Sequence, residues 1–394
     1  SLRVFKFKIL ELSIPGIVIS IIILVNYIGF PILFYDLNHF RTSQISDKDL
    51  IYQVWFYSSI HITLFIFGIV TGIIFLGKLK FKNIQNIKFF KLKKNQKIFL
   101  ILSSLFCILF YFGYFQKIGF DQIAILNLFK SKEELLNLRS IMGPEFDGDF
   151  FYNFFGKTLL GFVFIVLLTN YLISKNPYDL IFLILIGFFY LFFLTASTEK
   201  YQYVRYFLQI YFVWVVVRMD RKIKVFNLIG FLFVFFIIII FTYYYFMDKT
   251  SIFSSLLSGL DRIFLGNIIA GIYYYEYFPK IEGFLYGKSF PNPGGILPFG
   301  GYSLSRELYF YFNYEIVEKK NITGSIPAVF WAEMYANFGM IFSYLISYLV
   351  GYFLYFLNKF LYQFNANVLN ISLFIWLIMH YQELSISYLS KYLI

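Results

Sequence analysis

Residues 225–246 read VFNLIGFLFVFFIIIIFTYYYF, a run of twenty-two residues without a charge. A hydrocarbon core about 30 Å thick requires roughly 20 apolar residues of helix, at about 1.5 Å of rise per residue. This run is therefore expected to cross a membrane, and at least seven other stretches of the chain are nearly as apolar. The sequence predicts an all-α, polytopic membrane helix bundle of about 9–11 spans, a single transmembrane domain over residues 1–394.

The composition excludes several other classes of protein. The chain is 59% hydrophobic and only 14% charged, so no second, soluble domain is expected between the spans. Cys107 is the only cysteine, which excludes an intrachain disulfide and a cysteine-cluster metal site. The histidines, His39, His61 and His380, are far apart and lack ligand spacing, so no structural or catalytic zinc site is expected.

Charge-free runs predict nine spanning helices, and each is assigned by its length and apolar character. They are 14–35, 52–77, 98–117, 155–174, 179–198, 201–217, 225–246, 331–357 and 367–387. The first stretch is long enough to remain as a span and lacks a small-residue cleavage site, so no cleavable signal peptide is expected.

The basic residues predict the orientation of these spans. The 78–97 loop carries eight lysines and no acidic residue, and the 218–224 loop adds four basic residues. Positive-inside bias places both loops and the basic N-terminus in the cytoplasm, so the net charge of +12 is mostly a topology signal and nucleic-acid binding is disfavoured. The connections expected outside are 36–51, 118–154, the turn near 199 and 247–330.

Arg205 interrupts the sixth predicted span. Only twelve uncharged residues separate Arg205 from Arg218, which gives about 18 Å of helix, so the span must begin near Lys200 and include Arg205. An arginine at membrane depth is costly unless it is paired or lines a wet cavity, which makes it a candidate functional residue. The alternative is a long side chain that reaches the outer headgroups.

Two outer loops, 118–154 and 247–330, are too long to be simple connectors in a compact bundle, and long ordered loops often carry binding or catalysis. Within the second loop, residues 256–278 are interpreted as an amphipathic helix lying in the outer interface. The first loop contains a helix-like run, 121–139, followed by an acidic cluster, Glu145, Asp147 and Asp149. The loose spacing of this cluster argues against a divalent cation site.

Several short stretches resemble the Wzy-type polymerases of bacterial surface polysaccharides, which join the oligosaccharide repeat units of O-antigen and capsule. The longest are Thr-Gly-Ser-Ile-Pro at 323–327 and Glu-Met-Tyr-Ala-Asn-Phe-Gly at 333–339, which precede an apolar span. Shorter matches are Gly-Lys-Ser-Phe-Pro at 287–291, Leu-Asp-Arg-Ile at 260–263 and Leu-Arg-Ser at 138–140.

This resemblance implies a definite reaction and location. Such an enzyme, a GT-C-like glycosyltransferase of the bacterial inner membrane, transfers a glycan from undecaprenyl diphosphate onto the next lipid-linked repeat unit at the outer face. The partners that it implies are undecaprenyl-diphosphate-linked oligosaccharides, the lipid bilayer, a flippase and a chain-length regulator. The resemblance also implies that no cofactor takes part, neither a nucleotide sugar nor a metal.

Cleavage of the anomeric C–O bond leaves negative charge on a diphosphate, which arginines stabilise through bidentate hydrogen bonds in a site of low dielectric constant. The expected diphosphate ligands are Arg139, Arg205 and Arg262, with Lys200 and Arg306 in support. The alternative role for an outer-loop arginine is a surface ion pair, such as one between Arg262 and Asp261.

The attacking sugar hydroxyl also needs a proton acceptor. Glu333 is the first candidate because it lies in the matched stretch, and His380 and Glu383 are expected to share one face of the last span. His61 lies inside span two, and for each of these residues a satisfied hydrogen bond in the bundle is the alternative. The aromatic residues considered for sugar stacking, for which packing is favoured, are Tyr273, Tyr274, Tyr275, Tyr302, Tyr309 and Trp331.

Three other classes of protein remain open. An O-antigen ligase would use the same kind of donor and a similar outer loop but another acceptor. A flippase for lipid-linked oligosaccharides would need charges along a cavity open to both faces, whereas the charges within these spans lie toward the outer side. A purely structural membrane protein leaves the long outer loop and Arg205 without a role.

Overall fold

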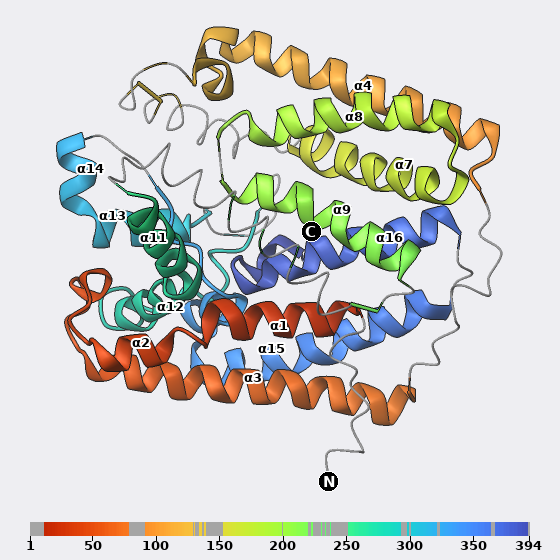
Figure 1. Ribbon diagram of the computed structural model, residues 1–394. Coiled ribbons are helices and arrows are strands. Elements are labelled where there is room, and N and C mark those ends of the chain that lie inside the picture. The colour runs from red at the N-terminus through yellow and green to blue at the C-terminus, as the bar shows by residue number, and fades with distance from the viewer. Residues whose placement is uncertain are drawn as a thin grey trace. The chain divides into compact units, whose positions relative to one another are not determined.

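The computed structural model describes residues 12–78, 91–128, 130, 134–135, 138, 153–198, 200–219, 222–223, 230, 233, 237, 251–292, 298, 301–320, 324–363 and 367–392. Within these residues the structure is helical and has no β-strand, and six helical segments are long and apolar enough to cross a membrane (Figure 1). The segments are Ile14–Tyr35, Asp49–Leu76, Lys94–Ile118, Phe154–Ser174, Pro177–Thr195 and Phe330–Gln363. The predicted all-α polytopic membrane bundle is thereby confirmed.

The remaining predicted spans have different outcomes. Residues 225–246 lie almost entirely outside the described residues. The span at 201–217 is the helix α9 (Lys200–Arg218), which carries too many polar side chains to be counted with the six. The span at 367–387 is wrong at its end, because α16 (Val368–Tyr381) has 14 residues and passes into a 3-10 turn, Gln382–Ser385. Fourteen residues give only about 21 Å of helix, which is shorter than the hydrocarbon core.

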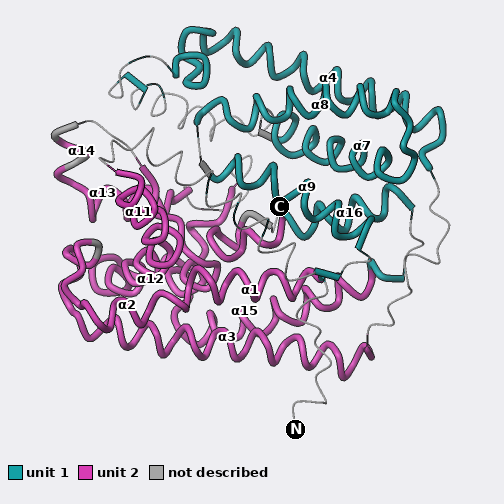
Figure 2. The backbone as a smooth tube through the Cα atoms, in the orientation of Figure 1, with its two compact units in different colours: residues 1–12, 81–249, 361–379 teal, residues 13–80, 250–360, 380–394 magenta. Residues whose placement is uncertain are grey.

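The chain forms two compact units, shown in teal and magenta in Figure 2. Unit 1 contains residues 1–12, 81–249 and 361–379, and unit 2 contains residues 13–80, 250–360 and 380–394. Each unit contains three of the six long apolar segments, apart from the last three residues of Phe330–Gln363. Neither unit is therefore a soluble domain inserted between the spans.

Unit 1 is built around the helix α7 (Leu160–Ser174), which packs against α8 (Pro177–Thr195) and α9. The Phe164 ring forms a three-ring cluster with two tyrosines: its centroid is 5.5 Å from Tyr190 and 5.0 Å from Tyr206, and the tyrosine centroids are 5.9 Å apart. The helix α4 (Lys94–Ile118) also packs on α7 and ends at Gly119. The helix-like run predicted from residue 121 is instead a pair of 3-10 turns, Phe120–Gln122 and Ala124–Asn127, as far as residue 127.

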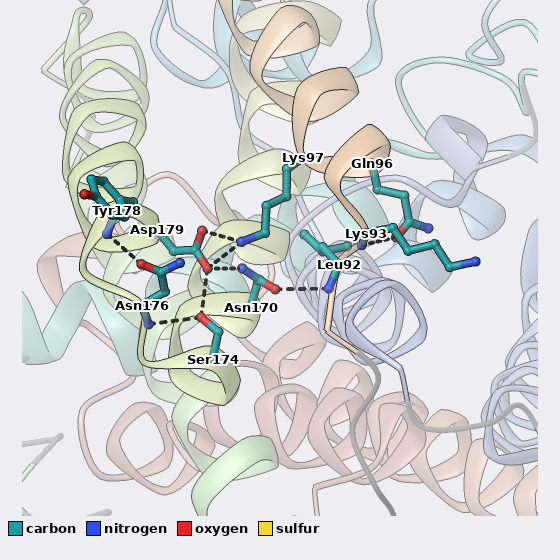
Figure 3. A network of polar contacts seen from close by, with 9 residues as sticks. All are labelled: Leu92, Lys93, Gln96, Lys97, Asn170, Ser174, Asn176, Tyr178 and Asp179. Atoms are coloured by element: carbon teal, nitrogen blue, oxygen red, sulfur yellow. Dashed lines mark hydrogen bonds and ion pairs between the residues drawn. The ribbon is translucent and has the colours of Figure 1, made fainter.

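A charged network joins the ends of three helices in unit 1 (Figure 3). The Asp179 carboxylate on α8 accepts hydrogen bonds from Lys97 of α4 at 2.6 and 2.9 Å, and from the Asn170 amide and the Ser174 hydroxyl of α7 at 2.7 and 2.8 Å. The Asn170 side chain in turn accepts the Leu92 N–H at 3.3 Å. Lys97 is one of the eight lysines of the predicted cytoplasmic loop. Its acidic partner, Asp179, lies in the first turn of α8, at an end that was predicted to be on the same side.

Unit 2 contains α1 (Ile14–Asn26), α2 (Phe30–Tyr35), α3 (Asp49–Leu76) and α15 (Phe330–Gln363). α3 and α15 approach so closely that glycine is needed at the crossing. A Cβ on Gly68 would lie 2.0 Å from the Tyr348 carbonyl oxygen, and one on Gly351 would lie 2.1 Å from the Phe65 carbonyl oxygen. Small residues allow such backbone contact between helices in a membrane.

The described part of the segment that was predicted to lie outside, 247–330, folds into short helices: α11 (Ile252–Phe264), α12 (Gly266–Tyr277), α13 (Leu304–Phe312) and α14 (Tyr314–Lys320). α11 and α12 are bent by 46° and together meet the criteria for a broken span or a re-entrant loop. Every residue from Ile268 to Tyr277 is buried. The prediction of one amphipathic interface helix over residues 256–278 is therefore wrong for its second half, which has no polar face exposed to solvent.

Within each unit, the ends that were assigned to one membrane side contact each other. In unit 2 the Ser46 N–H donates to Glu276 at 2.8 Å, which joins two predicted outer segments, and Tyr355 donates to the Gly77 carbonyl at 2.9 Å, which joins two predicted inner ends. In unit 1 the Ile125 N–H donates to the Ala196 carbonyl at 3.1 Å, which joins two ends that were predicted to lie outside. The alternation of loops predicted from charge therefore agrees with the folding of each unit.

Candidate functional site

The centre of the candidate site is a break in α15 at Gly339. Gly339 has φ 77° and ψ −173°, a conformation essentially restricted to glycine. A helix that ends leaves its last carbonyl groups without helical partners. Here the Ala336 carbonyl accepts the Leu285 N–H at 3.0 Å and the Asn337 carbonyl accepts the Tyr286 N–H at 2.9 Å. The break thus attaches residues 285–286 to α15.

The Asn337 side chain strengthens this attachment. Its Oδ1 atom accepts the Gly287 N–H at 3.0 Å, and its Nδ2 atom donates to Ser289 Oγ at 2.7 Å and to the Glu333 carbonyl at 2.9 Å. Asn337 is fully buried, and these three bonds satisfy both the acceptor and the donor side of its amide. It therefore joins the 287–289 stretch to the helix in one defined geometry.

Glu333 lies one helical turn before Asn337 and is also fully buried. Its carboxylate accepts the Ser390 N–H at 3.1 Å, the Ser390 hydroxyl, and the Ser289 hydroxyl at 3.4 Å. Among the described residues, no lysine or arginine forms an ion pair with it. A buried carboxylate needs such donors, and its place in the first turn of a helix adds the favourable field of the helix N-terminus.

Glu333, Asn337, Ser289 and Ser390 form a polar cluster. Two tyrosines, Tyr274 and Tyr388, form a further hydrogen-bonded pair in unit 2. The Tyr274 hydroxyl of α12 donates to the Ile326 carbonyl at 3.0 Å, so in its 2.7 Å contact with Tyr388 the Tyr388 hydroxyl is the donor. Before α13, the Tyr302 N–H donates to the Lys288 carbonyl at 2.9 Å. Burial, followed by a hydrogen bond to Tyr277, raises the pKa of Tyr302 above its usual value. The phenol is therefore neutral at physiological pH.

The three predicted catalytic residues lie in unit 2 in different settings. Glu333 is at the centre of the polar cluster. His380 is half-buried near the end of α16, with its ring 5.6 Å from that of Tyr381. Glu383 is half-buried in the following 3-10 turn. The two residues were expected on one face of a continuous helix, but α16 ends at Tyr381, between them.

The predicted diphosphate ligands are divided between the units. Arg262 on α11 and Arg306 on α13 are exposed in unit 2. Asp261 lies 3.9 Å from His39, and no ion pair between Asp261 and Arg262 is formed in the part of the chain described. In unit 1, Arg139 and the acidic cluster lie outside the described residues, as does the side chain of Lys200 at the start of α9.

Arg205 lies on a buried polar face of α9 in unit 1. The spacing of Gln202, Arg205 and Gln209 places them on one face of the helix, and both glutamines are buried. Gln209 Nε2 donates to the Tyr190 hydroxyl at 3.0 Å. Arg205 itself is half-buried, and its Nε atom is buried within unit 1. In the preceding turn, the buried hydroxyls of Ser197 and Thr198 have no hydrogen-bond partner among the described residues.

His61 has the structural role that was its alternative. Ser347 donates to the Ser343 carbonyl at 3.1 Å, so it accepts the hydrogen of His61 Nδ1 at 2.8 Å. The imidazole stacks on Trp331 at 4.9 Å with an interplanar angle of 3°. His61 therefore has a defined tautomer and a packed position between α3 and α15.

The aromatic residues considered for sugar stacking are mostly committed to packing. Tyr273 stacks on Phe312 at 4.0 Å, and Tyr274, Tyr275 and Trp331 are buried. Sequence reasoning missed Asn337, Ser289 and Ser390. The signal for the first two was available, since both are hydrogen-bonding residues within the stretches that carry the resemblance; no signal pointed to Ser390.

Comparison with models of known protein families, with curated proteins and with solved structures found no match for this chain.

Proposed function

We propose that the protein is a membrane glycosyltransferase that polymerises undecaprenyl-diphosphate-linked oligosaccharide repeat units at the outer face of the bacterial inner membrane. The observation that carries this proposal is that 287–291 and 333–339, two of the stretches that resemble the polymerases, are joined by hydrogen bonds: Gly287 N–H donates to Asn337, Asn337 to Ser289, and Ser289 to Glu333. Chance matches in unrelated loops have no reason to meet in one buried cluster.

In the proposed reaction, a hydroxyl of the acceptor sugar attacks the anomeric carbon of the donor glycan. The new glycosidic bond forms as the bond to the diphosphate oxygen breaks, and the hydroxyl proton passes to a protein base. The leaving group is undecaprenyl diphosphate, whose negative charge arginines stabilise. The residues proposed for this role are Arg262, with Arg306 in support, in unit 2, or Arg139 and Arg205, with Lys200 in support, in unit 1.

The proposal gives Glu333 a positioning role rather than that of the base. Its carboxylate is fully buried and held by Ser289 and Ser390, so it has no free surface for an acceptor hydroxyl. His380 and Glu383 are half-buried and are the candidate proton acceptors. In this role, Glu333 holds the 287–289 stretch and the C-terminal segment around Ser390 against α15.

Deletion of the gene in its host separates the proposed function from its alternatives. We expect a surface glycan of one repeat unit on its carrier. Polymer that stays untransferred would indicate a ligase, and the absence of any exported unit would indicate a flippase.

A biochemical test uses protein in lipid nanodiscs with repeat units extracted from the deletion strain. Wild-type protein should extend them, and Asn337→Ala should abolish extension because the 287–289 stretch loses its attachment. Asn358→Ala is the matched control, since Asn358 is also a fully buried asparagine of α15 and accepts the Ile14 N–H at 3.1 Å far along the helix from Asn337. Equal loss in both variants, at matched amounts of folded protein, would contradict the assignment of the site.

A further inference from the structure

Tyr286 has an unusual combination of backbone and side-chain features. Its φ is 50°, in the left-handed region that bulky residues avoid, and the next residue, Gly287, has φ 92°. Its ring is nevertheless 72% exposed. The unfavourable backbone conformation is therefore not compensated by burial of the aromatic ring.

The backbone on both sides of this ring is fixed. The N–H groups of Leu285, Tyr286 and Gly287 all donate to Ala336 or Asn337 at 2.9–3.0 Å, and the Lys288 N–H donates to the Leu285 carbonyl at 3.1 Å. Leu285 itself is buried. The tyrosine ring is thus presented outward from a rigid support that is part of the candidate site.

A turn of this geometry does not require tyrosine. Glycine and asparagine adopt the left-handed conformation at lower cost and are the usual residues there. Strained residues persist where the surrounding structure fixes them, and they are concentrated at functional sites. An aromatic residue that only anchors the protein in the membrane interface needs no particular backbone conformation. The position therefore indicates a need for the ring itself.

We infer that Tyr286 is the platform on which a sugar ring of the oligosaccharide substrate stacks, an inference that rests on the proposed function. One face of a pyranose presents C–H groups that pack on an aromatic face, while its hydroxyls stay in water. Of the aromatic residues considered from sequence for sugar stacking, Tyr274, Tyr275 and Trp331 are buried and Tyr273 is stacked on Phe312, whereas Tyr286 is exposed. It determines affinity for the glycan and takes no part in bond cleavage.

The test compares Tyr286→Asn, Tyr286→Phe and wild type in chain extension of lipid-linked repeat units extracted from the deletion strain. Asparagine tolerates the left-handed backbone but removes the ring, so KM should rise about 2- to 12-fold, the range of one aromatic contact, while kcat stays within about twofold. Phenylalanine keeps the ring face and should behave as wild type. Tyr314→Asn is the control, because Tyr314 is a 63% exposed tyrosine on α14 outside the cluster.

Three outcomes would overturn the inference: an unchanged KM in Tyr286→Asn, an equal loss in Tyr286→Phe, or an equal loss in Tyr314→Asn. Equilibrium binding of the same extracted repeat unit to nanodisc-embedded protein provides a second readout. If wild type binds but does not extend the unit, the proposed reaction fails, and a weaker Kd in Tyr286→Asn alone would still support the platform. If all variants bind the unit equally, the platform fails by itself.

Discussion

At the scale of single residues, buried polar side chains determine the architecture of the candidate site. Asn337 and Ser289 form a directed chain in which the Asn337 amide donates to the Ser289 hydroxyl, and that hydroxyl donates to the Glu333 carboxylate. Each group has its hydrogen-bond direction fixed by the next. A buried network of this kind is worth most when every member is satisfied and loses most when one is removed.

Replacement of Glu333 tests this network directly. Glu333→Gln exchanges one acceptor oxygen for an NH₂ group that faces donors, so we expect the free energy of unfolding to fall by about 1–3 kcal/mol. The measurement is denaturant or thermal unfolding of the purified protein in detergent, together with limited proteolysis of the C-terminal segment, which should become faster. Glu307→Gln is the control, because Glu307 is exposed on α13 and should change stability by less than about 0.5 kcal/mol. Equal stability of Glu333→Gln and wild type would mean that the carboxylate holds nothing in place.

The buried face of α9 gives a second prediction at this scale. If Arg205 stabilises the diphosphate, Arg205→Lys should not restore function, because an ammonium cannot make the planar two-oxygen contact. Loss of one such transition-state contact costs about 3 kcal/mol, so the rate of chain extension should fall about a hundredfold.

Arg218→Lys is the matched control for Arg205. Arg218 lies on the same helix but donates from Nη2 to the Leu172 carbonyl at 2.9 Å, at the opposite end of α9. Chain extension by the Arg218→Lys variant should proceed at a rate near that of wild type. A near-normal rate in Arg205→Lys, at matched folded protein, would exclude Arg205 as a diphosphate ligand.

The sequence allowed some of these residues to be chosen and not others. Glu333 and Arg205 could be selected because each breaks a local pattern, the first in a matched stretch and the second in an apolar span. The partner of Glu333 could not, since Ser390 is 57 residues away along the chain and meets it only after folding. The left-handed backbone of Tyr286 was equally hidden, because tyrosine gives no signal for that conformation.

At the scale of elements, the functional features lie where helices are interrupted. Residues 340–363 of α15 give about 36 Å of helix and can cross the membrane by themselves. The segment before Gly339 is then free to bend and to expose its last carbonyls to the 285–286 backbone. Hydropathy predicts the existence of such a span but not its break, because the apolar pattern continues through Gly339.

Gly339→Ala tests the importance of this break. An added Cβ would lie 3.4 Å from the Phe284 ring, which is ordinary contact, so the penalty comes from the φ of 77° and not from a clash. We expect a loss of about 1–3 kcal/mol in the free energy of unfolding. We also expect a loss of chain extension, since in a straightened helix the carbonyls of Ala336 and Asn337 would accept helical hydrogen bonds and no longer bind residues 285–286. The two measurements are unfolding in detergent and extension of lipid-linked units.

Gly113→Ala is the control for this substitution. Gly113 lies on an exposed face of α4, and a Cβ there would have no neighbour within 4 Å. Both stability and extension should remain at wild-type values. If Gly339→Ala matched this control, the special backbone at Gly339 would have no role in the site.

At the scale of the whole molecule, composition and charge predicted the fold class, and the reason is physical. A helix that crosses a membrane must be long and apolar regardless of its neighbours, so its signal is local. Polar contacts between distant segments carry no local signal: Asp179 with Lys97 and Glu276 with Ser46 could not be read from the chain. The bend of 46° between α11 and α12 was hidden in the same way, since each half looks like an ordinary helix in sequence.

The last prediction concerns the orientation of the whole chain. Lys78 and Lys288 are both exposed in unit 2, one beside the end of α3 and the other on the 287–289 stretch bound to α15. Positive-inside bias places Lys78 and Lys88 in the cytoplasm, and the alternation of spans then places Lys288 outside. In a Cys107→Ser background, a membrane-impermeant maleimide added to intact cells should label Lys288→Cys and spare Lys78→Cys and Lys88→Cys. Permeabilised cells, in which all three should be labelled, provide the control. Labelling of position 78 or 88 from outside would invert the chain and place the Glu333 cluster on the cytoplasmic side, where a reaction on exported repeat units could not occur.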